Sequence, residues 1–446
     1  MEPLKMSQHD WWSCAGWQQM SRRRSLGTMA SIAGASWLTS VAEQLARGED
    51  SSQRKGTGRP KSLLMLWLAG GPSQLETFDP HPGTQIGGEV KAISTSIPKL
   101  EIADTLPQTA EQMHRACLVR SVVSKEGDHE RATFNVKTGW RPEPTIVHPS
   151  IGAVLCHQQP SNLEIPRHIS ILAGQWPARG GFLGPTYDAF QMQDPREPIP
   201  NLTTRVAKSD FDRRVGTLLS TLESEFKRGR LTNMDSQRTQ HQAATQRAIA
   251  MMSSAQLDAF DISKEASDLT KSFGDTPFGR GCLAAIRLID RGVRCVEVEL
   301  SGWDSHISNH ELQSQRAKQL DAALAATLSE LAKRDLIEST IVFCGGEFGR
   351  TPTINPAGGR DHWPHGFSVL LAGGSLRRGA VLGETSAEPI VADSDPARRT
   401  VRPVTVADLH TTMLQALDID ASQELMTPIG RPMKLSEGHA IPDLLM

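Results

Sequence analysis

The sequence predicts an α/β protein with a doubly wound, mostly parallel sheet and helices on both of its faces. Apolar runs of strand length recur along the chain, and segments with a helical spacing of apolar residues lie between them. Ionisable residues directly follow several of the apolar runs. Such alternation of strands and helices is typical of a parallel sheet that is covered on both faces.

The predicted strands are short, continuous apolar runs, the pattern of strands that are buried inside a protein. The first, residues 63–69, is followed by Gly70-Gly71-Pro72, a strong turn signal. Further runs lie at residues 117–123, 169–173, 293–300, 340–344 and 367–372. A membrane-spanning helix needs about 20 apolar residues, so we expect no membrane span in the mature chain.

Two helices are predicted between these strands. Residues 278–290 are amphipathic and end at Arg291-Gly292, a helix stop before the next strand. Residues 312–332 carry a stripe of Leu and Ala at helical spacing. Residues 205–275 are more polar and rich in Gln, Arg and Ser, and there we expect a helical insertion packed on the sheet.

The overall charge is close to balance, with 48 Lys and Arg against 50 Asp and Glu and a formal net charge of −2. Binding nucleic acid through its phosphates needs a basic excess on some face. We therefore expect no nucleic-acid partner. The six cysteines are scattered without a C-x-x-C pair, so no thiolate metal site is predicted. The disulfide and oligomeric states stay open.

The amino-terminal segment has the order of a secretory signal. Residues 21–24 (S-R-R-R) open a basic stretch, a short and weakly apolar stretch follows, and residues 40–42 offer a small-x-small cleavage site. Paired arginines indicate twin-arginine export, so we expect a periplasmic or otherwise extracytoplasmic protein. Residues 1–48 would form the signal peptide and the start of a linker, 49–61 the linker, and 62–446 the mature domain. The alternative is a surface amphipathic helix with a basic start.

Four polar clusters follow predicted strands, and in open α/β sheets ligands bind beyond the carboxyl ends of the strands. The clusters are Asp128-His129-Glu130-Arg131, Asp304-Ser305-His306, Glu347-Phe348-Gly349-Arg350 and Arg360-Asp361-His362. Carboxylate and imidazole groups together suit zinc or manganese. Calcium, a further candidate, prefers ligands that are all oxygen.

Each cluster also has a structural interpretation. Asp304 and His306 could cap a strand end, and Glu347 with Arg350 could form a buried salt bridge that braces a glycine turn. Asp128 could simply begin a helix. The functional interpretation is favoured because all four clusters are predicted at one edge of one sheet.

The ordered motifs of the chain resemble those of a known family. They are G-G-P-S-Q-L-E-T-F-D-P, D-H-E-R-A-T, H-P-S-I-G, G-F-L-G-P-T-Y-D, G-W-D-S-H, G-E-F-G-R-T-P and G-R-D-H-W-P. Together they resemble the bacterial, exported domain-of-unknown-function family numbered 1501, over residues 62–446. That family is grouped with the alkaline phosphatase and sulfatase superfamily, which implies a metal site at the carboxyl edge of a doubly wound sheet. The resemblance implies metal ligation by Asp304, His306, Glu347 and His362, and it places His129 near the nucleophile position.

Two departures from sulfatases shape the functional hypotheses. The chain lacks the C/S-x-P-x-R motif, and its first strand ends without the aspartate that is usual there. The first hypothesis is an exported, metal-dependent hydrolase of phosphate or sulfate esters, in which His129 is catalytic and Arg350 or Arg131 clamps a small or polymeric anionic ester. Its nucleophile would differ from that of a sulfatase, for example a metal-bound water. The second is a non-catalytic extracytoplasmic binding protein that kept the fold.

Overall fold

The computed structural model describes residues 61–228, 240–388 and 398–446. The expected signal peptide and all but the last residue of the expected linker lie outside these residues. Within the described ranges, none of the helices combines the length and the apolar character needed to cross a membrane.

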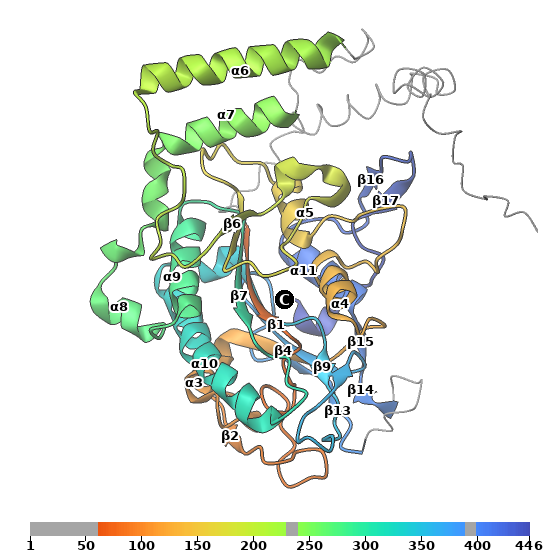
Figure 1. Ribbon diagram of the computed structural model, residues 1–446. Coiled ribbons are helices and arrows are strands. Elements are labelled where there is room, and N and C mark those ends of the chain that lie inside the picture. Colours follow the sequence, from red (N-terminus) through yellow and green to blue (C-terminus); the bar gives the residue numbers. More distant parts are fainter. Residues whose placement is uncertain (1–60, 229–239, 389–397) are drawn as a thin grey trace, which may run out of the picture. The chain divides into compact units, whose positions relative to one another are not determined.

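A nine-stranded sheet forms the centre of the described chain (Figure 1). Its path runs through β12 (Val381–Leu382), β4 (Ala116–Val123), β11 (Phe367–Ala372), β8 (Thr340–Gly345), β1 (Ser62–Ala69), β7 (Cys295–Ser301), β5 (His168–Ile171) and β6 (Phe190–Met192), and β15 (Val404–Thr405) also pairs with β4. Every neighbouring pair is parallel except the two pairs that β11 makes with β4 and β8. The prediction of a mostly parallel sheet is therefore confirmed.

The central strand β1 shows why continuous apolar runs became strands. Its side chains alternate between two hydrophobic clusters, with Leu64 and Leu66 in one and Leu63 and Met65 in the other. Burying each such side chain contributes roughly 1.5–3 kcal/mol to the stability of the fold, so a continuous apolar run is stabilised on both faces of the sheet. The first cluster includes residues of α3 (Pro107–Gln112), α9 (Pro277–Asp290) and α10 (Asn309–Lys333), and the second includes residues of α4 (His129–Thr138), α5 (Ile151–Gln158) and α11 (Val406–Ala416). Helices therefore cover both faces, as Figure 1 also shows.

Local features determine where the observed helix α9 and strand β5 begin or end. The hydroxyl of Thr276 accepts a hydrogen bond from the Gly279 amide and caps α9. Gly292 ends that helix with a φ of 98°, a conformation that favours glycine. The strand predicted at 169–173 stops at Ile171, because Leu172 turns the chain with a φ of 57°.

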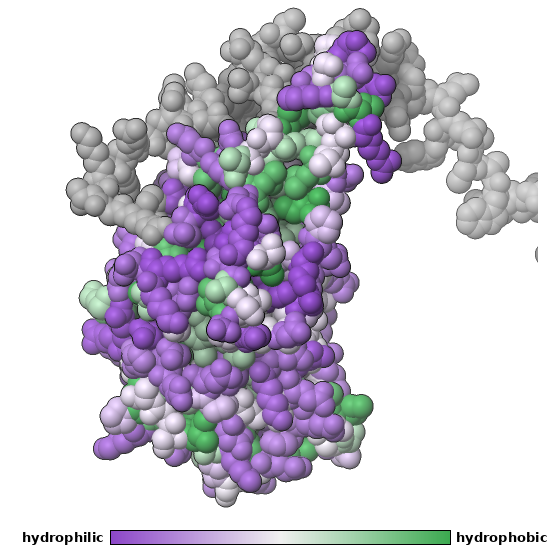
Figure 2. Space-filling model, turned by 90° about the vertical axis from the view of Figure 1, so that its left-hand side faces the viewer, coloured by the Kyte–Doolittle hydropathy of each residue, from purple (hydrophilic) through white to green (hydrophobic). Residues whose placement is uncertain are grey.

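The described parts of the polar segment 205–275, residues 205–228 and 240–275, are largely helical. They contain α6 (Lys208–Arg228), α7 (Gln240–Met252), η4 (Ala255–Phe260), η5 (Ile262–Lys264) and α8 (Ser267–Ser272). Phe260 and Ile262 are buried in the same cluster as α9. Figure 2 shows the face that lies on the left in Figure 1. Hydrophilic residues cover most of this face, and hydrophobic residues gather in its upper part.

Candidate metal centre

Parallel strands bring the candidate residues to one edge of the sheet. Asp304 and His306 follow β7, and Glu347 follows β8. His129 is the first residue of α4, which comes after β4. His362 lies in β10 (His362–Trp363), which pairs with β9 (Gly349–Arg350) beyond the end of β8. Because β1, β4, β7 and β8 run in the same direction, the segments that follow their carboxyl ends meet there.

A close approach of two turns fixes the position of Asp304. The Trp303 amide donates to the Ala69 carbonyl at 3.2 Å, which joins the turn after β7 to the turn after β1. A Cβ at Gly70, which has a φ of +114°, would lie 2.6 Å from the Asp304 amide nitrogen. Glycine is therefore required at the end of β1, both for its φ and for this contact.

Asp304 lies at the centre of a group of imidazoles. Its Oδ2 is 3.5 Å from His129 Nε2, and its Oδ1 is 3.1 Å from His306 Nε2 and 3.4 Å from His362 Nε2. One ligand atom from each of His129, Asp304 and His362 lies within 4.8 Å of the others, a separation that a single metal ion could bridge. Of the four metal ligands expected from the sequence, the structure thus brings Asp304, His306 and His362 together, and it adds His129.

Each of the three histidines is oriented through its Nδ1 atom. His129 Nδ1 lies 2.7 Å from Glu347 Oε1, His306 Nδ1 lies 2.9 Å from Asp361 Oδ1, and His362 Nδ1 lies 2.9 Å from the Gly127 carbonyl. These partners accept hydrogen bonds, so each holds a proton on Nδ1 and, in the neutral imidazole, leaves the lone pair on Nε2. The Nε2 atoms of His306 and His362 are only 3.1 Å apart. Two lone pairs at this distance repel each other unless a cation or a proton lies between them. Carboxylate or carbonyl partners at Nδ1 are also typical of histidines that bind metals.

Glu347 stands behind His129 rather than beside the other ligand atoms. Its side chain is buried, and its Oε1 accepts hydrogen bonds from His129 Nδ1 and, at 2.8 Å, from the Gly70 amide. Its Oε2 is buried and has no hydrogen-bond partner among the described residues. Glu347 therefore orients His129 in this structure.

The two arginines expected to clamp an anion have other partners. Arg350 is fully buried and donates to Asp304 Oδ1 at 2.7 Å, to the Gly71 carbonyl at 2.9 Å and to the Gly70 carbonyl. It thereby fixes Asp304 against the turn after β1. Arg131 is half exposed, and its Nε donates to Glu126 at 2.7 Å. The structure does not bring Arg131 into contact with the histidines.

The surroundings shift the pKa values of three members of the group in different directions. Burial raises the pKa of Asp304, but the hydrogen bond and charge of Arg350 outweigh it and hold that pKa below its usual value. The hydrogen bond to Glu347 raises the pKa of His129. Burial lowers the pKa of His362, which keeps its Nε2 lone pair available near neutral pH.

Residues 174–176 border the site and are held by hydrogen bonds to the buried side chains of Lys137 and Glu299, which were not predicted as functional residues. The ring of Trp176 stacks on His129 with 6.4 Å between ring centroids. The Trp176 carbonyl accepts a hydrogen bond from Lys137 at 2.9 Å, and Lys137 also pairs with Glu297 at 2.9 Å. The Gly174 amide donates to Glu299 at 3.1 Å. The signal for these residues was present in β7, whose sequence C-V-E-V-E-L-S places two acids on one face of a buried strand.

The comparisons with known proteins identify the family. The family model described as "Protein of unknown function (DUF1501)" matches residues 60–445, and the chain belongs to this family. A search of curated proteins returned no significant match.

Several solved structures from the alkaline phosphatase and sulfatase class resemble the chain. A protein in the alkaline phosphatase superfamily from Vibrio parahaemolyticus shares 14% identity with a TM-score of 0.34, covering 82% of this chain and 68% of that one. The PsFucS1 sulfatase from Pseudoalteromonas sp. shares 12% identity with a TM-score of 0.35, covering 87% and 72%. The C-terminal periplasmic domain of EcEptC from Escherichia coli, in complex with Zn, shares 12% identity with a TM-score of 0.36, covering 89% and 94%. These likenesses are too distant to carry an argument about the site or its substrate.

Proposed function

We propose that the protein is an exported, metal-dependent hydrolase that acts on phosphate or sulfate esters. One observation carries the proposal: the Nε2 atoms of three histidines, each oriented through Nδ1, converge on the carboxylate of Asp304. The ester class rests on the sequence motifs, which resemble a family grouped with the alkaline phosphatase and sulfatase superfamily.

His129, Asp304 and His362 are the proposed metal ligands. Two imidazoles and a carboxylate suit zinc or manganese better than calcium, which prefers ligands that are all oxygen. A divalent ion held there would supply a Lewis acid and lower the pKa of a bound water toward about 7. Three protein ligands leave a coordination position free, as catalytic zinc sites require. Glu347 supports this set by orienting His129, and Arg350 by fixing Asp304.

His306 and Asp361 form the proposed proton-transfer pair. The His306 side chain is 47% exposed, against 22% for His129 and 25% for His362, so it can exchange protons with solvent. With Nδ1 held by Asp361, its Nε2, which lies 3.1 Å from both Asp304 Oδ1 and His362 Nε2, would accept a proton from a nucleophile bound beside Asp304. This assignment moves His306 from the ligand role that the sequence suggested to that of a general base.

The second candidate, a non-catalytic binding protein, is favoured by the residue at the helix start. His129 occupies the start of α4, near the position where the resemblance implies a nucleophile, and its Nε2 faces Asp304. If His306 is a fourth ligand, the four side chains fill a tetrahedral ion and close the site, as in structural zinc sites.

One experiment separates the two candidates. The full chain, loaded with zinc or manganese, is assayed on a panel of aryl phosphates and sulfates beside His306→Ala, with His439→Ala as a control at an exposed histidine. The hydrolase proposal expects turnover by the wild type and by the control, and a His306→Ala variant that keeps its metal but loses about a hundredfold or more in rate. Loss of the metal in His306→Ala, with no turnover by the wild type, would establish the closed, non-catalytic site.

Export is supported by the sequence of the amino-terminal segment. Replacing Arg22 and Arg23 with Lys should retain the protein in the cytoplasm if the twin-arginine route is used, as shown by cell fractionation. Unchanged export of this variant would contradict the route.

A further inference from the structure

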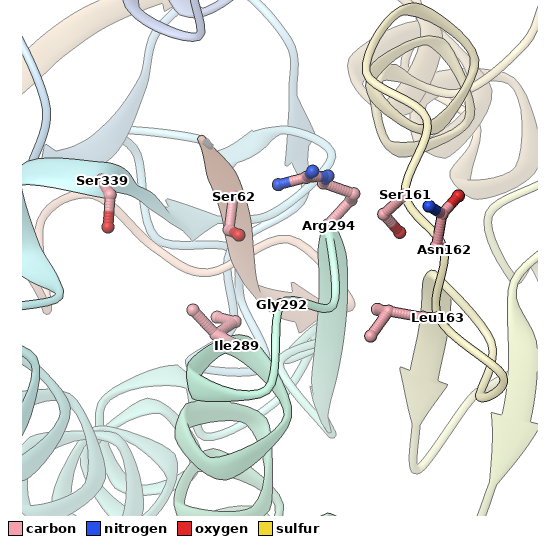
Figure 3. Close-up of a pocket in the computed structure, with 8 residues that line it drawn as sticks. All are labelled: Ser62, Ser161, Asn162, Leu163, Ile289, Gly292, Arg294 and Ser339. Atoms are coloured by element: carbon pink, nitrogen blue, oxygen red, sulfur yellow. The ribbon is translucent and has the colours of Figure 1, made fainter. Parts of the chain in front are cut away.

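A cavity lies at the amino ends of β1 and β7, opposite the candidate metal centre at their carboxyl ends. It has a volume of about 280 Å³ and opens where β1 begins at Ser62 and where Arg294 leads into β7. Ser161 and Leu163, from the segment between α5 and β5, line one side, and Ile289 lines another near the end of α9 (Figure 3). The metal centre lies beyond the carboxyl ends of the same strands, so the two sites are separated by the length of β1 and β7.

Arg294 is the main polar group of this cavity. It is only 7% exposed, and its Nε donates to the Gln159 carbonyl at 3.2 Å. Within the described part of the chain, none of the carboxylates forms an ion pair with its guanidinium. Burial, together with the charge of nearby Arg167, lowers the pKa of Arg294. A buried cation beside a second cation, without a counter-charge, is unfavourable unless an anion pairs with it.

Hydroxyl groups, the amide of Asn162 and apolar side chains also line the cavity. Figure 3 shows the guanidinium group of Arg294 between the side chains of Ser62 and Ser161. The Ser161 Oγ is buried and has no hydrogen-bond partner among the described residues. Leu163 and Ile289 supply apolar walls. The cavity thus combines a cation, an unpaired hydroxyl and an apolar surface within a space near the lower limit of ligand pockets, which are commonly about 300–1,000 Å³.

We propose that this cavity binds a small organic carboxylate, with its carboxylate on Arg294 and Ser161 and its short apolar body against Leu163 and Ile289. Arginine matches a carboxylate because its planar fork can donate two parallel hydrogen bonds. Inorganic phosphate would use the charge of Arg294 but leave the apolar walls exposed. The preferred ligand therefore has both a charge and an apolar part.

The test is calorimetric titration of the metal-free full chain, in an Asp304→Ala background that removes a centre ligand, with benzoate, acetate and inorganic phosphate as probes. The proposal expects saturable binding of benzoate, weaker binding of acetate and phosphate, and a loss of about tenfold or more in benzoate affinity for Arg294→Gln. Ser161→Ala should weaken binding by a smaller factor, and it keeps the test valid if Arg294→Gln does not fold. Arg213→Gln, at an exposed arginine of α6 that pairs with Asp210, is the matched control.

Three results would overturn the proposal. They are the absence of saturable benzoate binding, equal benzoate affinity in the Asp304→Ala background with and without Ser161→Ala, and phosphate binding as tight as that of benzoate. Because the background variant lacks Asp304, none of these results depends on whether the metal centre hydrolyses esters.

Discussion

Glu347 and His129, 218 residues apart in the sequence, are joined by a 2.7 Å hydrogen bond between Oε1 and Nδ1. Glu347 follows β8 and His129 begins α4, so the bond links segments that emerge from different strands. It fixes the imidazole so that Nε2 faces Asp304. A residue expected to bind metal directly thus acts on the proposed ion through a histidine.

Removing this support should weaken metal binding without abolishing it. Glu347→Ala should reduce zinc affinity by about 10–100-fold, the usual effect of losing the partner of a metal-binding histidine. Glu347→Gln should lose less, because its amide oxygen can still accept the Nδ1 proton. Competition with a chromophoric chelator measures these affinities, and Glu130→Gln, one residue after His129 and exposed, is the control. Equal affinity in Glu347→Ala and the control would contradict the supporting role.

Lys137 should be important for stability because it forms an ion pair with the buried Glu297, which also accepts a hydrogen bond from Ser170 Oγ at 3.1 Å. Lys137→Met leaves that carboxylate buried without its counter-charge, at an expected cost of about 3–5 kcal/mol in the free energy of unfolding. The double variant Lys137→Met, Glu297→Met removes both charges and should recover more than half of the loss. Urea unfolding of the two variants measures the difference. If the double variant is less stable than Lys137→Met, the uncompensated charge of Glu297 is not the cause of the loss.

Glu299 should make stability depend on pH near neutrality. Burial raises its pKa to about 7 from its ordinary value of 4.5. Between these two pH values the folded state keeps a proton that the unfolded state releases. The free energy of unfolding should therefore fall as pH rises through this window, by roughly 3 kcal/mol in total.

Glu299→Gln should remove this dependence while keeping an acceptor for the Gly174 amide. We expect the variant to gain stability over the wild type as pH rises from about 5 to about 7. Denaturant unfolding with a chelator present, which excludes metal effects, checks the prediction. Parallel pH profiles for the two proteins would contradict it.

The fold was predictable because its signals are local. The run at β1 is apolar at every position from Leu63 to Ala69, and only a strand buried on both faces uses all of them. Gly292 correctly predicted the end of α9. The antiparallel direction of β11 was not readable, because an apolar run carries no direction.

The site was predictable as a location but not as a set of contacts. Polar residues after parallel strands must meet at one edge, so Asp304, His306 and His362 were expected together. Which residue would bind the proposed ion, and which would support a ligand, depends on the directions of the side chains, and sequence spacing does not determine these directions. For this reason His129 lies beside the other ligand atoms, where Glu347 was expected, and Glu347 supports it from behind. Arg350 is enclosed by backbone carbonyls that no sequence pattern marks.

The most direct test of the central claim is the metal content of the purified full chain beside Asp304→Ala, His362→Ala and the double variant. These two residues are 58 positions apart and follow different strands, so a shared ion predicts a coupling that local structure does not. The account predicts about one zinc or manganese ion per wild-type chain, loss of most of it in either single variant, and no further loss in the double variant. Full retention of the metal by either single variant would contradict the account.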